Sequence, residues 1–400
     1  MDNTDPSHDL LAHHPTGPLV GLRILDVTHA AAGPFAAMLL ADLGAEVIKV
    51  EPPGGEFTRY SRPHLDDGTG PYGGRFAARN RNKKSIVLDL TDDGDRATFL
   101  ELVEGSDALI ENMRAGVLDR LGVGWEVVSQ RNPRLVYAAI RGFGDPRTGR
   151  SPYAQWPAFD IIAQAMGGLV SMTGPDADHP MRAGPLVGDI FPATLAALGL
   201  VSAVLHARTT GEGQFLDVAM VDAVMAMCAT SQSMWDYQGK PYEPSGNRSA
   251  EAVPFDVYET ADGHCAIAAP VDGHWHTLCR IMGRADLIDD PRLDTTMKRA
   301  EHRHLVDRVV GEWVRSRTTA ELMELLGGRV PVGPVMGPRE WATDPHVAGR
   351  SMLIEVPHPH HRPTVELGHP IKLTGTPANV YRRPPLLDEH GPELRSRSTS

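Results

Sequence analysis

A strand, a helix and a second strand follow one another near the start of this chain, and this succession constrains the fold more than any other feature. The first strand is predicted at RILDVT (residues 23–28), the helix at AAAGPFAAMLLADLG (30–44) and the second strand at AEVIKVE (45–51). Pro34 suits the first turn of a helix, and Gly44 suits the position just after its end. Such a unit predicts the opening of a parallel sheet covered by helices.

Further strands continue this alternation. They are predicted at SIVLDL (85–90), DALIEN (107–112) and LVYAAI (135–140), and GQFLDVAMVDAVMAMC (213–228) reads as a strand that runs into a helix. Strands that alternate with helical segments are typical of a doubly wound α/β domain.

The pattern divides the chain of 400 residues into a large and a small domain. Residues 1–19 read as a loose polar arm, and residues 20–230 as the first part of the large domain. A hairpin with Asp262–Gly263 at its turn is predicted within 253–270, followed by helical segments. We therefore expect a small domain at 231–328 and a C-terminal segment, 329–400, that returns to the large domain.

Composition narrows the classes of function. The formal net charge of −12 argues against nucleic acid as a partner. Three cysteines without CxxC spacing fit a reducing compartment, and the first residues resemble no signal peptide. No run of 18 apolar residues occurs. These features predict a cytoplasmic protein that spans no membrane.

Several familiar catalytic or metal-binding patterns are missing from the sequence. The first strand–helix turn, THAAAGPF, has one glycine, Gly33, instead of the GxGxxG spacing of a dinucleotide-binding fold. No GxSxG nucleophile turn is present. His358, His360 and His361 lie in a Pro-rich segment without paired acids, so a surface loop is the better interpretation than a metal site.

Two acidic residues stand at the starts of predicted helices. Asp160 begins the AQAMGG helix, and Asp189 stands at the mouth of a long apolar helix. A carboxylate at such a place is favoured by the helix dipole and by free N–H groups. Asp189 is therefore either an ordinary N-cap or a carboxylate nucleophile presented to an acyl group.

Cations gather in two segments of the predicted large domain. ARNRNKKSI (78–86) contains Arg79, Arg81, Lys83 and Lys84, and ENMRAGVLDRLG (111–122) places more cations after a strand. Such a run is either a solvated loop or a phosphate or carboxylate site. Ligands bind at the carboxyl ends of strands in open α/β sheets, which favours the second segment as part of a site.

Taken together, these segments resemble the class III coenzyme A transferases (the CaiB/BaiF family). The resemblance is carried in order by residues 18–55, NRNKKSIVLDL (80–90), ENMRAGVLDRLGVGWEVV (111–128), NPRLVYAAIRGFG (132–144), FDIIAQAMGGLVSMTG (159–174) and TGEGQFLDVAMVDAV (210–224). VPVGPV, DPHVAGRSM and PPLLDEHG extend it to residue 391. The 2-methylacyl-CoA racemases are a branch of the same family.

The resemblance implies a Rossmann-like large domain with a parallel sheet, a smaller α+β lobe, and two chains interlocked as a homodimer. It implies an acyl-CoA:carboxylate CoA-transferase that uses acyl-CoA and a carboxylic acid, with no metal or redox cofactor. An aspartate, here Asp189, attacks the acyl-CoA thioester to form an anhydride and then carries CoA as a thioester. Asp160 holds a second acidic position that orients groups or forms part of the wall.

The resemblance also implies which residues bind coenzyme A. These are Ala31, Ala32, Leu88, Asn112, Met113, Arg114 and Arg120, with Arg81 and Lys84 as phosphate contacts and Phe159, within 156–159, along the pantetheine arm.

Two departures from the family pattern bear on function. The racemase branch has a histidine where this chain has Phe159, which cannot move a proton. The Gly-rich loop of formyl-CoA transferases is absent, and residues 244–254 stand near its place. A 2-methylacyl-CoA racemase and a non-catalytic acyl-CoA-binding protein remain as alternatives.

Overall fold

The structure is a computed structural model that describes residues 11, 14–65, 71–249 and 251–397. The chain divides into two compact units. The large unit comprises the described parts of Met1–Val170, Arg182–Asp236 and Pro345–Ser400, and the small unit comprises Ser171–Met181 and Tyr237–Asp344. The small unit thus extends 16 residues beyond the expected end at 328 and includes a short segment from the middle of the chain.

A six-stranded parallel sheet forms the centre of the large unit, with the order β3-β2-β1-β4-β5-β6. The strands are β1 (Arg23–Asp26), β2 (Glu46–Glu51), β3 (Lys83–Val87), β4 (Ala108–Glu111), β5 (Val136–Arg141) and β6 (Phe215–Ala219). The predicted parallel α/β sheet is confirmed. The strand order reverses at β1, between β2 and β4, and ligands of open α/β sheets bind next to such a reversal.

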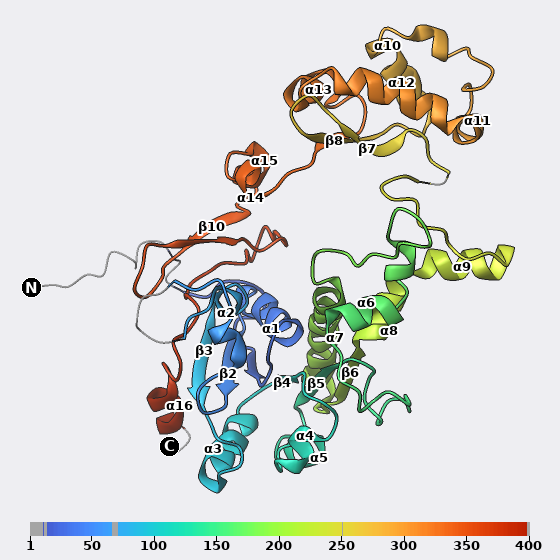
Figure 1. Cartoon of the computed structure of the whole chain (residues 1–400). Helices are drawn as coiled ribbons and strands as arrows, with labels where there is room; N and C mark the ends of the chain where they lie inside the picture. Colours follow the sequence, from blue (N-terminus) through green and yellow to red (C-terminus); the bar gives the residue numbers. More distant parts are fainter. Residues whose placement is uncertain (1–10, 12–13, 66–70, 250, 398–400) are drawn as a thin grey trace, which may run out of the picture. The chain divides into compact units, whose positions relative to one another are not determined.

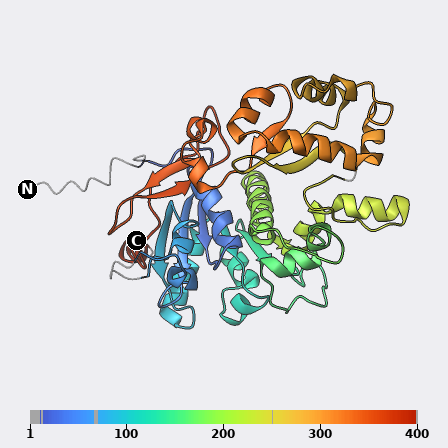
Figure 2. The same cartoon turned by 45° about the horizontal axis from the view of Figure 1, so that its top comes forward.

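Small side chains let the helices of one face pack closely on the sheet. This face carries α1 (Ala32–Asp42), α6 (Asp160–Met166), α7 (Val187–Thr210) and α8 (Met220–Met227). Ala36, Ala37, Ala196 and Leu200 are buried where α1 and α7 lie side by side (Figures 1 and 2). Helix α7 is long and apolar enough to cross a membrane by length and composition, but its buried residues belong to this core.

The opposite face of the sheet is covered by α3 (Asp93–Glu104), α4 (Val117–Arg120), α5 (Trp125–Arg131) and α16 (Gly391–Arg397). Phe99, Val103, Val128 and Leu394 pack there against buried strand residues. Because strand side chains alternate between the faces, strands β1, β2, β4, β5 and β6 contribute to both cores, as in a doubly wound fold.

The C-terminal part of the large unit covers β3, the edge strand of the sheet (Figure 1). The Val87 N–H donates to the Asp388 carboxylate at 2.7 Å, and the Asn82 N–H donates to the Arg382 carbonyl at 3.0 Å. These contacts satisfy backbone groups that an open edge would expose. The remaining elements of the large unit are η2 (Phe57–Tyr60), α2 (Gly74–Ala77), α15 (Pro345–Gly349), β10 (Leu353–Val356) and β11 (Thr364–Leu367).

The small unit is built on an antiparallel sheet of β7 (Phe255–Glu259), β8 (His264–Ala268) and β9 (Val332–Pro334). The predicted hairpin is confirmed, with Glu259 paired with His264 beside its turn. Trp275, Val310 and Leu322 are buried in the core where the helices pack against this sheet. The helices are α10 (Asp272–Ile281), η4 (Ala285–Leu287), α11 (Thr296–Glu301), α12 (Arg303–Arg315), α13 (Thr319–Leu326) and α14 (Pro338–Trp341); η3 (Val170–Met172) and α9 (Ala229–Gln238) stand where the chain passes between the units.

Candidate active site

A buried ion cluster supports the turn between β1 and α1. Asp26, Lys49 and Lys83 are fully buried, and the Lys83 ammonium lies 2.7 Å from the Asp26 carboxylate. Lys49 donates to the Thr28 carbonyl at 2.8 Å, and the Thr28 N–H donates to Asp26 at 3.0 Å. Burial alone would raise the pKa of Asp26, but the two lysine charges and the hydrogen bonds from Lys83 and Thr28 hold it well below its usual range. These buried contacts hold the turn in place.

The shape of this turn depends on two residues. Ala30 has a positive φ of 65°, which is uncommon for a residue other than glycine. A Cβ at Gly33 would lie 2.3 Å from the Thr28 side chain, so the single glycine of THAAAGPF is required by close packing. The Glu56 carboxylate accepts a hydrogen bond from the Ala30 N–H at 3.4 Å. The start of α1 is therefore held in one position.

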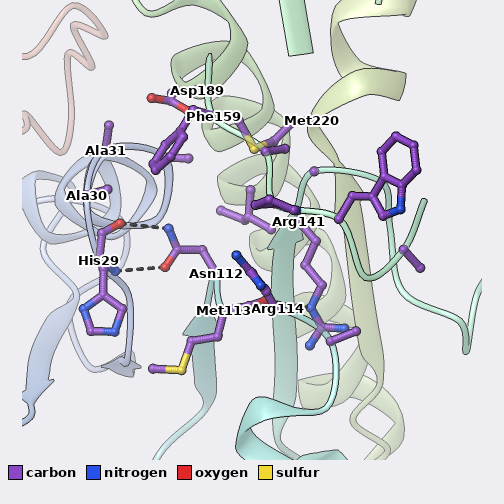
Figure 3. A pocket seen from close by; sticks show the side chains of 18 of the residues that line it. His29, Ala30, Ala31, Asn112, Met113, Arg114, Arg141, Phe159, Asp189 and Met220 are labelled. Carbon is purple, nitrogen blue, oxygen red and sulfur yellow. Dashed lines mark hydrogen bonds between the residues drawn. The ribbon is translucent and has the colours of Figure 1, made fainter. Parts of the chain in front are cut away.

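A cavity of about 250 Å³ opens beside this turn, at the carboxyl ends of β1, β4 and β5 (Figure 3). Its position next to the reversal of strand order is where an open α/β sheet binds ligands. Seven residues predicted from the sequence line it, namely Ala31, Ala32, Asn112, Met113, Arg114, Phe159 and Asp189.

Asn112 joins two parts of the cavity wall. Its amide donates to the His29 carbonyl at 2.8 Å and accepts from the His29 N–H at 2.8 Å, as Figure 3 shows. These two bonds tie the end of β4 to the β1–α1 turn. Arg114 lies just beyond, exposed, and forms no ion pair among the described residues. Asn112 thus shapes the cavity, whereas Arg114 is free to bind an anion.

Asp189 is the third residue of α7 and does not cap the helix. Leu186 is the N-cap, and the Asp189 N–H donates to the Leu186 carbonyl at 3.1 Å. The N-cap interpretation is therefore wrong, and the carboxylate lies at the upper rim of the cavity (Figure 3). Burial raises the pKa of Asp189 to about 6, the charge of Asp160 adds to this effect, and Arg79 opposes it.

Asp160, at the start of α6, is buried behind the cavity wall instead of lining it. Its carboxylate accepts hydrogen bonds from the Gly188 N–H at 2.8 Å and from the Gln164 amide at 2.9 and 3.0 Å. A Cβ at Gly188 would lie 2.5 Å from the Asp160 carbonyl oxygen, so only glycine allows this approach. Asp160 thus fixes the first turn of α7, on which Asp189 stands.

Comparison with known proteins identifies the family. The model of CoA-transferase family III matches residues 19–391. The chain belongs to the class III CoA-transferases. It is 43% identical over 380 residues to the succinyl-CoA:mesaconate CoA-transferase of Haloarcula hispanica, covering 94% of this chain and 96% of that protein.

Two further comparisons agree with this assignment. The transferase is 37% identical over 386 residues to the acetyl-CoA:oxalate CoA-transferase of Acetobacter aceti, covering 95% of this chain and 96% of that one. A solved CaiB/BaiF family protein from Brucella suis matches with a TM-score of 0.85 and 31% identity, covering 96% of this chain and 100% of that one.

The structure pairs Arg81 and Lys84, the two predicted phosphate contacts, with carboxylates of the transferase itself. Arg81 lies 2.7 Å from Asp42 and donates to the Leu367 carbonyl at 2.6 Å. Lys84 lies 2.9 Å from Glu46 and 3.0 Å from Glu393. Neither lines the cavity. These cations hold the C-terminal segment on the sheet. Their role as CoA phosphate contacts stays a prediction.

Leu88 and Arg120 also lie outside the lining of this cavity. The Leu88 side chain is 1% exposed and packs in the core of the opposite face. The strand pattern in the sequence could not show which face this side chain meets. Arg120 is exposed on α4. The structure therefore does not bring these two predicted CoA contacts to the cavity.

Several lining residues were missed by the sequence analysis, among them His29, Phe57, Arg141 and Met220. His29 and Arg141 stand at the carboxyl ends of β1 and β5, a signal that could have found them. Burial, followed by the charge of Lys49, lowers the pKa of His29, which favours a neutral imidazole. Arg141 is paired with Glu111 and Asp145 and therefore stabilises the wall of the cavity.

Among the described residues, no group of three or more His, Cys, Asp or Glu is placed to hold a metal ion.

Proposed function

We propose that this transferase moves CoA from an acyl-CoA to a free carboxylate through covalent intermediates on Asp189. One observation carries the proposal: of the described residues that line the cavity, Asp189 alone has a carboxylate. Its partial burial weakens its hydration, and a less hydrated carboxylate attacks a thioester more readily.

The proposed reaction has four balanced steps. The Asp189 carboxylate attacks the thioester carbonyl, an O–C bond forms, and CoA leaves as a thiolate. The thiolate attacks the Asp189 carbonyl of the anhydride, which gives an aspartyl-CoA thioester and releases the first acid. The acceptor carboxylate attacks this thioester and again expels the thiolate. The thiolate then attacks the acceptor carbonyl, which yields the new acyl-CoA and restores Asp189.

The cavity offers groups suited to CoA. Arg114 carries a free positive charge for a phosphate, and the exposed rings of Phe57, Trp156 and Phe159 offer apolar contact for the pantetheine arm. None of the four steps transfers an electron, and none requires a metal ion. We therefore propose that the enzyme works without a resident cofactor.

We also propose dicarboxylic acids as the substrate class. The two curated relatives described above are named for succinyl-CoA and mesaconate and for acetyl-CoA and oxalate, and succinate, mesaconate and oxalate are dicarboxylic acids. We further propose a cytoplasmic, interlocked homodimer. Its support within the large unit is the exposure of Leu198, Leu205 and Trp235, apolar side chains that a partner chain would cover.

Hydroxylamine tests the covalent step, because it converts an anhydride or an acyl thioester of aspartate into a hydroxamate. With succinyl-CoA present, we expect mass spectrometry to find the hydroxamate on the peptide that contains Asp189. Without acyl-CoA, and in Asp189→Asn, no adduct is expected. An enzyme that turns over succinyl-CoA yet never forms the adduct contradicts the proposal.

Exchange of an α-hydrogen of 2-methylacyl-CoA in deuterated water, without an acceptor acid, would indicate the racemase instead.

The pH dependence of transfer provides a second prediction. Because Asp189 must be ionised to attack, kcat/KM should fall as the pH drops through the raised pKa of about 6. Asp160→Asn keeps an oxygen for the Gly188 N–H but removes the neighbouring negative charge. We expect this substitution to move the acid limb of the profile to lower pH, with a tenfold change in proton affinity for each 1.4 kcal/mol of repulsion removed. An unchanged limb in an active Asp160→Asn variant would show that the two carboxyl groups do not interact.

A further inference from the structure

Gln164 is a fully buried polar residue of α6 to which the four proposed steps give no role. Its amide nitrogen donates to the two oxygens of Asp160 at 3.0 and 2.9 Å, and to the carbonyl oxygens of Ala183 and Pro185 at 3.4 Å. Its amide oxygen accepts a hydrogen bond from the Ala183 N–H at 2.9 Å. Both polar atoms of this side chain therefore join α6 to residues 183–185.

Residues 183–185 lead directly into the turn of α7 that carries Asp189. The chain re-enters the large unit at Arg182, after a segment that belongs to the small unit. Leu186 is the N-cap of α7, and its carbonyl accepts a hydrogen bond from the Asp189 N–H at 3.1 Å. Gln164 therefore holds the chain between the point of its return and the start of the helix.

The first turn of α7 depends on support from outside the helix. Its N-cap, Leu186, forms no side-chain hydrogen bond with the helix N–H groups. Pro192 lies within the helix and has no N–H, so the Gly188 carbonyl lacks the hydrogen bond that a residue four positions later normally donates. The Gly188 N–H is bound by the Asp160 carboxylate at 2.8 Å. The position of Asp189 therefore depends on buried groups of α6.

We propose that Gln164 is a positioning residue that holds the Asp160 carboxylate and residues 183–185 together and thereby keeps Asp189 at the rim of the cavity. This inference rests on the proposed function and names the group that orients its nucleophile. Gln164 does not line the cavity, so it acts only through the groups that it binds. An amide suits this place because it donates and accepts at once, whereas an apolar side chain would leave Asp160 and the Ala183 N–H with unmade hydrogen bonds.

Gln164→Met tests the proposal, because methionine keeps the length of the side chain and removes its N–H donors. With succinyl-CoA as donor and mesaconate as acceptor, we expect kcat to fall on the order of 100-fold, the size of loss that a misplaced reacting group produces. The dissociation constant for CoA, measured by calorimetric titration, should change less than about 3-fold, because no group that lines the cavity is removed.

Two further variants complete this comparison. Gln130→Met, at an exposed position of α5, is the matched control and should change neither quantity. Gln164→Asn keeps the amide but shortens its reach by one carbon, and it should show the same pattern if Gln164→Met does not fold. A loss of CoA affinity as large as the loss of kcat would show general disruption of the cavity and would overturn the inference.

Hydrogen exchange gives a readout that does not need turnover. The peptide that contains residues 183–189 should exchange its amide hydrogens faster in Gln164→Met than in the native enzyme, because the Ala183 N–H loses its acceptor. Gln130→Met should leave this rate unchanged. If exchange and kcat both change as expected while hydroxylamine forms no adduct at Asp189 in the native enzyme, the covalent mechanism fails but the positioning role of Gln164 stands. An unchanged kcat, with or without faster exchange, overturns the inference about Gln164.

Discussion

Asp189→Asn is expected to lower kcat for CoA transfer by at least about 10⁴-fold, the size of loss seen when a covalent nucleophile is removed. The amide cannot attack a thioester, yet it has almost the same volume, so acyl-CoA binding should change less than about 3-fold. Steady-state kinetics and calorimetric titration measure the two quantities. Asp222→Asn is the matched control, because Asp222 also stands in the first turn of an apolar helix but lies outside the cavity.

The same variant should make the folded protein more stable at pH 7. The pKa of Asp189 is raised in the fold to about 6, so the folded protein holds this proton more tightly than the unfolded chain does. Stability then falls as the pH rises from about 4 to about 6, and the cost persists above that window. Asn carries no such cost, so we expect a gain of about 1–3 kcal/mol in the free energy of unfolding at pH 7, absent below about pH 4. Activity retained within tenfold, or a loss of stability, would contradict this account of Asp189.

Asp26→Ala is expected to destabilise the large unit by about 3–5 kcal/mol, because it leaves buried ammonium groups without their carboxylate. Lys83 and Lys49 lie 2.7 and 3.7 Å from Asp26, and all three side chains are fully buried. The turn at Ala30 should loosen as well, so acyl-CoA binding should weaken. Urea unfolding followed by circular dichroism measures the loss.

Asp93→Ala serves as the control for this prediction. Asp93 pairs with Arg96 on the surface of α3, where its carboxylate is 92% exposed. Exposed pairs contribute about 0–1 kcal/mol, so this variant should unfold almost as the native protein does. If Asp26→Ala unfolds within about 1 kcal/mol of the native protein, the buried cluster does not stabilise the turn in the way described.

The strands could be predicted from the sequence because their signals are local. Apolar runs between helical segments placed every strand of the large sheet. The local pattern at Asp189 left two interpretations open, and its role as the nucleophile, which the family resemblance implies, stays a prediction. The contacts of Arg81 and Lys84 could not be predicted, since their partners include Leu367 and Glu393, which lie 286 and 309 residues away in the sequence. A run of cations looks the same in sequence whether it binds a ligand or another part of the chain.

The face of the sheet that Leu88 meets could not be predicted for a different reason. A continuous apolar run does not show which face of a fully buried sheet each side chain meets. The cavity itself is formed by the segments around residues 30, 57, 113, 141, 157 and 189, together with Met220, so its wall exists only once these segments fold together. The sequence could have pointed to functional residues at the ends of strands. It could not show which residues distant in sequence contact one another.

The covering of β3 by the last part of the chain has a consequence for biosynthesis. All six strands of the large sheet have been translated by residue 219, yet buried Arg59 and Asn82 depend on the carbonyl groups of Pro385 and Asn379. During translation, the edge strand of the nascent sheet therefore stays uncovered while more than a hundred further residues are added. Chaperone contact during that interval, or slowed recruitment of a second chain, would protect an edge that the finished protein covers for itself.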